Sequence, residues 1–121
     1  MLLKDFYKLN SLTVSENLAT AKITINKSHE IFKGHFPGNP VTPGVCMMQI
    51  IKELTEQILD KKLFMRSSSN VKFMAIINPE LTPDLVLELD ITETDSGYRV
   101  KNNTTFDDTV ALKLTNHYSI I

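Results

Sequence analysis

The chain has a single cysteine and no tryptophan among its 121 residues. One cysteine cannot form an intramolecular disulfide, so the sequence fits a reducing compartment, and we expect the cytoplasm. This residue, Cys46, stands in an apolar run and is predicted to be a small core side chain rather than a nucleophile. The first ten residues include Lys4, Asp5 and Lys8 and lack a long apolar stretch, so we expect neither a signal peptide nor a membrane span there.

The chain also lacks an excess of charge of either sign, with a formal net charge of -1 at pH 7. This balance gives no electrostatic reason to expect binding to nucleic acid or to an anionic membrane. The only loose basic cluster, Lys61, Lys62 and Arg66, is predicted to be a solvated helix end, with docking of an acidic carrier protein as the alternative. The length predicts one domain over residues 1–121.

Glycine and proline are scarce, with four and five residues respectively, yet three of each fall between Gly34 and Gly44. His35 lies inside this cluster, and a strongly apolar run follows it. The pattern predicts a rigid loop that leads into a helix, with Thr42 as its N-cap and Pro43 in its first turn.

The rest of the chain predicts one helix and several strands. The first half of the helix is apolar almost all round, which is typical of a buried helix, and its second half becomes polar up to Lys62. A buried helix followed by antiparallel strands is an α+β layout. We expect a short helix or irregular lead-in at 2–9, a polar loop at 66–70, and strands at 19–27, 71–77, 85–94, 98–106 and 110–119.

The segment His35-Phe36-Pro37-Gly38-Asn39-Pro40-Val41-Thr42-Pro43-Gly44-Val45 resembles a motif of the bacterial 3-hydroxyacyl-acyl-carrier-protein dehydratases. The lead-in at 31–34 is similar to that family as well, as is the segment 71–74 followed by Pro79 and Pro83. The resemblance covers about residues 17–118, which is most of the chain.

This resemblance implies a hot-dog fold, in which a curved antiparallel β-sheet wraps around a long central helix. It also implies a homodimer or a higher even oligomer, with active sites at the subunit interface. The implied activity is that of a lyase of fatty-acid or related acyl-chain synthesis, which converts a 3-hydroxyacyl thioester into a trans-2-enoyl thioester. No metal or cofactor is implied, because the acyl group arrives on the phosphopantetheine of an acyl carrier protein.

The resemblance also assigns roles to residues of the motif. His35 matches the catalytic base, a role that suits a neutral imidazole near pH 7. Gly44 matches the glycine whose N–H binds the thioester carbonyl oxygen at a helix N-terminus, and Val45 is expected to contact the substrate beside it. Four further residues are expected to shape the loop that aims the histidine, the last through its backbone carbonyl: Pro37, Gly38, Pro40 and Val41.

The sequence departs from the family at one position, fourteen residues after His35, where the family has Glu or Asp as the general acid and this chain has Gln49. A glutamine side chain forms hydrogen bonds but cannot deliver a proton at neutral pH. In a first interpretation Gln49 holds the substrate hydroxyl, and water or a nearby acid such as Glu53 supplies the proton. On helical periodicity, however, a solvated outer face is the simpler expectation for Glu53 and Glu56.

Two further interpretations of Gln49 do not require this chain to supply an acid. In one, the chain forms a mixed dimer with a related dehydratase subunit that contributes the acid. In the other, it is catalytically degenerate and binds an acyl chain or an acyl carrier without dehydrating it. Thioester hydrolysis on the same fold is a further option, which the histidine motif disfavours.

Overall fold

The computed structural model describes residues 4–33 and 40–121. Within them the chain forms one α-helix and one six-stranded antiparallel sheet, which confirms the predicted α+β class and adds a strand to the five predicted. The elements in chain order are β1 Tyr7–Ser15, β2 Leu18–Ile25, a 3-10 helix Glu30–Lys33, α1 Gly44–Leu59, β3 Leu63–Phe73, β4 Asp84–Thr94, β5 Gly97–Phe106 and β6 Thr109–Ile120.

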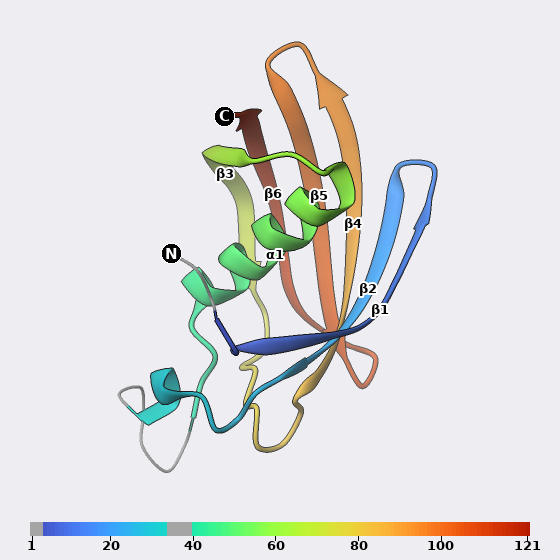
Figure 1. The fold of residues 1–121 in the computed structure, drawn as a ribbon. Coiled ribbons are helices and arrows are strands. Elements are labelled where there is room, and N and C mark those ends of the chain that lie inside the picture. Colours follow the sequence, from blue (N-terminus) through green and yellow to red (C-terminus); the bar gives the residue numbers. More distant parts are fainter. Residues whose placement is uncertain (1–3, 34–39) are drawn as a thin grey trace.

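The sheet has the strand order β1-β2-β4-β5-β6-β3 and curves around α1, which lies across its concave face (Figure 1). The helix supplies a continuous apolar stripe to this layer, because Cys46, Met47, Ile50, Ile51 and Leu54 are all buried. Every second side chain of β2 and β4 is buried against the helix, because successive side chains of a strand point to opposite faces of the sheet. The core therefore lies between α1 and the sheet, and Cys46 belongs to it as predicted.

Strand β1 corrects the prediction of a helix or lead-in at residues 2–9. The segment does alternate, with Tyr7 and Leu9 packed against the core, but its register against β2 shifts between Leu9 and Ser11. After this irregularity the inward positions change phase to Leu12. A bulge of this kind hides the strand from a pattern search, because the alternation breaks in the middle.

Strand β3 corrects the predicted loop at 66–70. Arg66–Asn70 is polar, yet it continues β3 because β6 supplies a partner strand along this stretch, with Ser68 opposite Asn116. The strand then ends at Phe73, whereas the sequence predicted a strand from 71 to 77. Pairing with a neighbour has therefore overridden local composition at an edge of the sheet.

The ends of α1 differ from the prediction in their detail. Pro43, not Thr42, occupies the N-cap, and no side chain of the described residues caps this end of the helix. Thr42 is buried instead, its N–H donates to the Ile77 carbonyl at 2.9 Å, and its hydroxyl has no partner among the described residues. The helix ends at Leu59, three residues earlier than expected, because Asp60 takes a left-handed conformation with φ 54°.

Candidate functional site

A groove of about 330 Å³ lies where the exposed side of α1 meets the start of β3. Gln49 lines it together with Val45 and Met48 from the helix and Phe64 and Met65 from the strand. Val45 is 67% exposed and Phe64 55% exposed, so the groove has an apolar wall open to its surroundings. The structure thus brings Gln49 and Val45, two of the residues predicted for the site, onto one surface.

Gln49 is hydrogen-bonded to the next turn of the helix. Its Nε2 donates to Oε2 of Glu53 at 3.0 Å, and the hydroxyl of Tyr7 on β1 donates to Oε1 of the same carboxyl group at 3.1 Å. Both contacts are partly buried, so the expectation of a solvated face is wrong for Glu53. It is also wrong for Glu56, whose Oε2 accepts the N–H of Leu63 at 2.9 Å and so ties the end of α1 to the start of β3.

The surroundings of Tyr7 keep its phenol protonated. Burial is the main cause that raises the pKa of Tyr7, and the negative charge and hydrogen bond of Glu53 raise it further. A neutral phenol can donate to a carboxylate, which is the direction that the contact requires. Tyr7 therefore acts as a hydrogen-bond donor throughout the neutral pH range.

Gly44 is the first residue of α1, where backbone N–H groups have no acceptor within the helix. The ring of Phe73 covers it so closely that a Cβ built on Gly44 would lie 2.6 Å from Cζ of Phe73. Only glycine fits here unless the aromatic ring moves, and that ring is 56% exposed. Glycine at residue 44 thus has two explanations: the predicted binding of a carbonyl oxygen by its N–H, and the close contact of the Phe73 ring.

The remaining predicted residues lie before the helix. Pro40 is buried and Val41 half-buried in the segment that leads to Pro43. His35, Pro37 and Gly38 lie outside the described residues. The base and the loop predicted around it therefore remain predictions.

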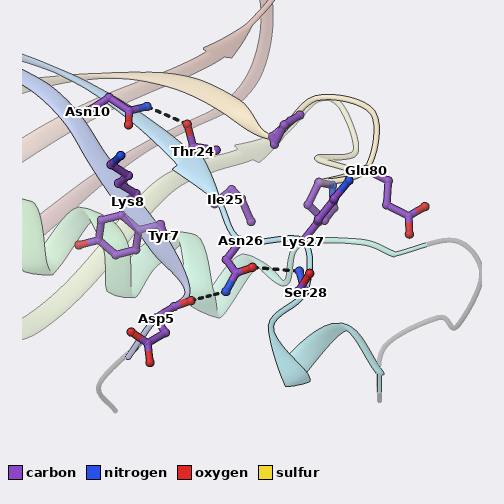
Figure 2. Close-up of a pocket in the computed structure, with 12 residues that line it drawn as sticks. Asp5, Tyr7, Lys8, Asn10, Thr24, Ile25, Asn26, Lys27, Ser28 and Glu80 are labelled. Atoms are coloured by element: carbon purple, nitrogen blue, oxygen red, sulfur yellow. Dashed lines mark hydrogen bonds between the residues drawn. The ribbon is translucent and has the colours of Figure 1, made fainter.

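A larger groove of about 690 Å³ lies beside the segment that leads from β2 toward residue 33 (Figure 2). The hydrogen bonds of its polar side chains join neighbouring segments of the chain. Asn26 donates through Nδ2 to the Asp5 carbonyl at 2.8 Å and accepts the Ser28 N–H at 3.0 Å. Asn10 likewise donates to the hydroxyl of Thr24 at 2.7 Å. We infer that these contacts fix the segment that follows β2 against β1 and have no part in catalysis.

The other two histidines, His29 and His117, have local partners. His29 accepts the Ile31 N–H at Nδ1 and contacts the Lys4 carbonyl through Nε2 at 3.0 Å. His117 lies 3.4 Å from the hydroxyl of Ser67. Within residues 4–33 and 40–121 there is no group of three metal-binding side chains and no helix long and apolar enough to span a membrane.

The sequence did not point to Tyr7, Phe64 or Met65 as parts of the site. Tyr7 was hidden by the broken alternation of β1. Phe64 and Met65 belong to β3, and only the pairing of that strand with β6 brings them beside the helix. An aromatic and apolar run directly after a helix is a weak indication of an edge strand, and it is the only sequence feature that could have pointed to Phe64 and Met65.

Comparisons of the sequence with known proteins find dehydratases. Residues 11–112 match the family model described as ApeI-like, ApeI dehydratase. The chain is 31% identical over 115 residues to the 3-hydroxyacyl-[acyl-carrier-protein] dehydratase FabZ of Lactobacillus helveticus, a match that spans 86% of this chain and 74% of that protein. The FabZ of Pediococcus pentosaceus is 35% identical over 69 residues, but the match spans only 51% of this chain and 45% of that protein.

Solved structures show the same fold at lower identity. The dehydratase heterocomplex ApeI:P from Xenorhabdus doucetiae matches with a TM-score of 0.79 and 18% identity, covering 93% of this chain and 96% of the other. A hypothetical thioesterase from Streptococcus pneumoniae, solved with coenzyme A, matches with a TM-score of 0.69 and 10% identity over 99% of this chain and 91% of the other. Together with the helix wrapped by six antiparallel strands, these likenesses confirm the hot-dog fold.

Proposed function

The chain belongs to the ApeI-like dehydratase family, and from this membership we propose that it takes part in the dehydration of a 3-hydroxyacyl thioester to a trans-2-enoyl thioester. The observation that carries the proposal is the family match over residues 11–112, which includes His35, Gly44 and Gln49. The substrate would be carried on the phosphopantetheine of an acyl carrier protein, and the reaction would take place in the cytoplasm. We propose no metal and no redox cofactor, because the chemistry needs only proton transfer and charge stabilisation.

In the proposed reaction His35 removes a proton from the carbon next to the thioester carbonyl. The electrons of that C–H bond form the new double bond while the C–O bond to the 3-hydroxyl breaks. Negative charge that builds up on the thioester oxygen would be stabilised by the N–H of Gly44, at the positive end of α1. The departing oxygen must also gain a proton to leave as water.

Gln49 stands where that proton donor is expected, and a glutamine amide cannot supply it at neutral pH. Losing a general acid typically lowers a rate by about 10²–10⁴-fold. Alone, the chain would then be a slow dehydratase, with water as the proton source. We regard Glu53 as a poor substitute acid, because both of its oxygens accept hydrogen bonds from other residues.

A second candidate is a mixed assembly in which a related subunit contributes the missing acid. ApeI:P from Xenorhabdus doucetiae is described as a dehydratase heterocomplex, which shows that proteins of this fold can assemble from two different chains. In such a pair His35 of this chain would face the partner's acid, while Gln49 would face the partner's base. The presence of Gln49 favours this candidate over a homodimer with two full active sites.

The edge strand β3 is the surface that we propose for either dimer. It is the last strand of the sheet and exposes Phe64, Met65, Val71 and Phe73, of which Phe64 and Met65 also line the groove at Gln49. An apolar edge strand with free backbone groups favours pairing with another strand. The opposite edge, β1, exposes fewer large apolar side chains, with Val14 as the principal one.

The proposed function is tested with purified chain and a 3-hydroxybutyryl carrier thioester, following the absorbance of the enoyl product. We expect slow turnover that is abolished in His35→Ala and retained in His117→Ala, the matched histidine control. Co-expression with a related acid-bearing dehydratase subunit should raise the rate if the two chains pair. Full turnover in His35→Ala, or no turnover alone and with such a subunit, would overturn the assignment.

A further inference from the structure

On the basis of the function proposed above, we propose that Tyr7 is a positioning residue that acts through Glu53 on Gln49. In this arrangement the three side chains fix the Gln49 amide so that its carbonyl oxygen, and not its amide nitrogen, is presented to the 3-hydroxyl group of the substrate. Gln49 would then accept a hydrogen bond from that hydroxyl and select for substrates that carry one.

The three side chains come from two elements and are partly buried where they meet. Tyr7 is the first residue of β1, and Gln49 and Glu53 lie one turn apart on α1. The two hydrogen bonds, 3.1 Å to Oε1 and 3.0 Å to Oε2, use both oxygens of the Glu53 carboxyl group. Tyr7 lies 46 residues from Glu53 in sequence, so the contact depends on the fold and not on helix periodicity.

The direction of the second hydrogen bond fixes the orientation of the amide. A carboxylate accepts hydrogen bonds and cannot donate them, so only the NH₂ end of Gln49 can face it. The carbonyl oxygen is attached to the same carbon and lies on the other side of the amide group. Because Gln49 also lines the groove with Val45 and Met48, this oxygen is the acceptor available to a ligand that occupies the groove.

Tyr7 makes this orientation dependable. Without its hydroxyl, Glu53 would lose one of the donors that hold its carboxyl group, and Glu53 would hold the amide of Gln49 less firmly. Burial and the charge of Glu53 keep the phenol protonated, so Tyr7 donates at every pH at which the enzyme is expected to work. A hydrogen bond to a charged group is stronger than one between neutral groups, so the Glu53 carboxylate favours one of the two amide orientations.

A fixed carbonyl acceptor has a consequence for substrate choice. A 3-hydroxyacyl group can donate to it, whereas a 3-oxoacyl group offers only another acceptor and would leave two oxygens facing each other. Sites built for a hydroxyl reject analogues that lack it, because buried polar groups are left unpaired. The lone pairs of the bound hydroxyl remain free to take the proton that water or a partner subunit supplies.

The network is tested first by NMR, independently of activity. The chain has only two glutamines, Gln49 and Gln57, so selective ¹⁵N-glutamine labelling gives two side-chain NH₂ signals, and Gln57 is an exposed internal control. We expect Tyr7→Phe and Glu53→Met to shift the Gln49 signal and speed its exchange with water, while the Gln57 signal stays unchanged. Tyr98→Phe is the matched tyrosine control. If Tyr7→Phe leaves the Gln49 signal in place, the positioning role is wrong.

The selection is tested by ligand binding in a His35→Ala background, which prevents turnover. We expect 3-hydroxybutyryl-pantetheine to bind about tenfold more tightly than 3-oxobutyryl-pantetheine, and Tyr7→Phe to reduce that ratio to below about threefold. A ratio that Tyr7→Phe does not change would overturn the selection. Binding of neither thioester, with the NMR result intact, would instead refute the proposed function and leave the network standing.

Discussion

The Gln49 amide nitrogen lies 3.0 Å from Oε2 of Glu53, one turn further along α1. A polar pair at this spacing often stabilises a helix locally. In this chain one member of the pair, Gln49, stands at the position where the resemblance places the family's general acid. The relationship has chemical consequences, because an acid introduced at residue 49 would meet a second carboxyl group at hydrogen-bonding distance.

Replacing Gln49 with glutamate should therefore create a pair of carboxyl groups that share a proton. Two adjacent carboxylates cannot both ionise without cost, so one pKa of the pair rises toward neutrality. The raised group would be a proton donor, and we expect Gln49→Glu to increase the dehydration rate of the chain by about 10²–10⁴-fold. The rate is measured from enoyl absorbance at pH 6–8 in matched protein preparations.

The control for this substitution is Gln57→Glu, which adds the same charge on an exposed part of the same helix. It should leave the rate unchanged. The gain in Gln49→Glu should also disappear when His35→Ala is added. A rate in Gln49→Glu equal to that of the wild type would show that the missing acid does not limit the reaction.

Gly44 and Phe73 should behave as a coupled pair. An alanine at residue 44 places a methyl group 2.6 Å from the ring of Phe73, which must swing outward and can do so because it is largely exposed. We expect Gly44→Ala to change the free energy of unfolding by less than about 1 kcal/mol, because glycine has the poorer helix propensity. Activity should fall at least about tenfold, since the methyl group and the displaced ring crowd the first turn of α1.

A double-mutant cycle with Phe73→Leu measures this coupling. The smaller side chain leaves room for the methyl group, so the stability cost of Gly44→Ala should shrink in that background. The loss of activity should persist if the N–H of residue 44 must be approached closely by the substrate. Full activity in the double variant would mean that glycine is required only to accommodate the ring.

The sequence sufficed for those parts of the fold in which local pattern and tertiary structure agree. Strands β4 and β5 alternate throughout and β6 alternates from Leu112 onward, with turn residues between the strands, so their predicted bounds lie within one residue of the observed ones. Strand β1 was missed because its bulge breaks the alternation, and the middle of β3 was missed because its pairing comes from β6. Both errors lie at the two edges of the sheet, where composition constrains a strand least.

The sequence predicted only those residues of the candidate site that belong to the motif or have a fixed position in the helix after it. Gln49 and Val45 follow from the spacing after His35, and the structure places both in one groove. The hydroxyl of Tyr7 could not be predicted beside Glu53, because the contact joins an unpredicted strand to the helix. The solvated interpretation of Glu53 failed for the same reason: helical periodicity gives the face of a helix but not what packs against it.

Stability should decrease in alkaline solution because two phenols are held protonated by the fold. Burial raises the pKa of Tyr118 to about 12, and burial together with Glu53 raises that of Tyr7. A tyrosine in the unfolded chain titrates near pH 10, so the native state binds more protons than the unfolded state above that pH. The stabilisation is fully present below about pH 10 and is lost as the pH rises toward about 12.

Urea unfolding at intervals between pH 9 and 12 measures this slope. Tyr7→Phe and Tyr118→Phe should each flatten it, and the double variant should flatten it most. Their stabilities at pH 7 serve as the baseline, which removes the constant cost of each lost hydroxyl. An unchanged slope in the double variant would mean that other groups cause the alkaline loss.

Charge on the β3 edge should prevent assembly without unfolding the subunit. Phe64 and Val71 are exposed on that strand, so Phe64→Lys/Val71→Lys removes no packing within the subunit core but places two cations in the proposed interface. We expect the double variant to be a folded monomer by native mass spectrometry and circular dichroism. Activity should be lost with the dimer, because the base and the groove at Gln49 would no longer come from two adjoining subunits.

Val14→Lys is the matched control, because Val14 is similarly exposed on β1, the opposite edge of the sheet. That variant should assemble and turn over as the wild type does. If Val14→Lys separates the subunits and the β3 variant does not, the interface lies along β1. A β3 variant that is monomeric yet fully active would show instead that one subunit holds a complete site, and that Gln49 belongs to the same active site as His35 of its own chain.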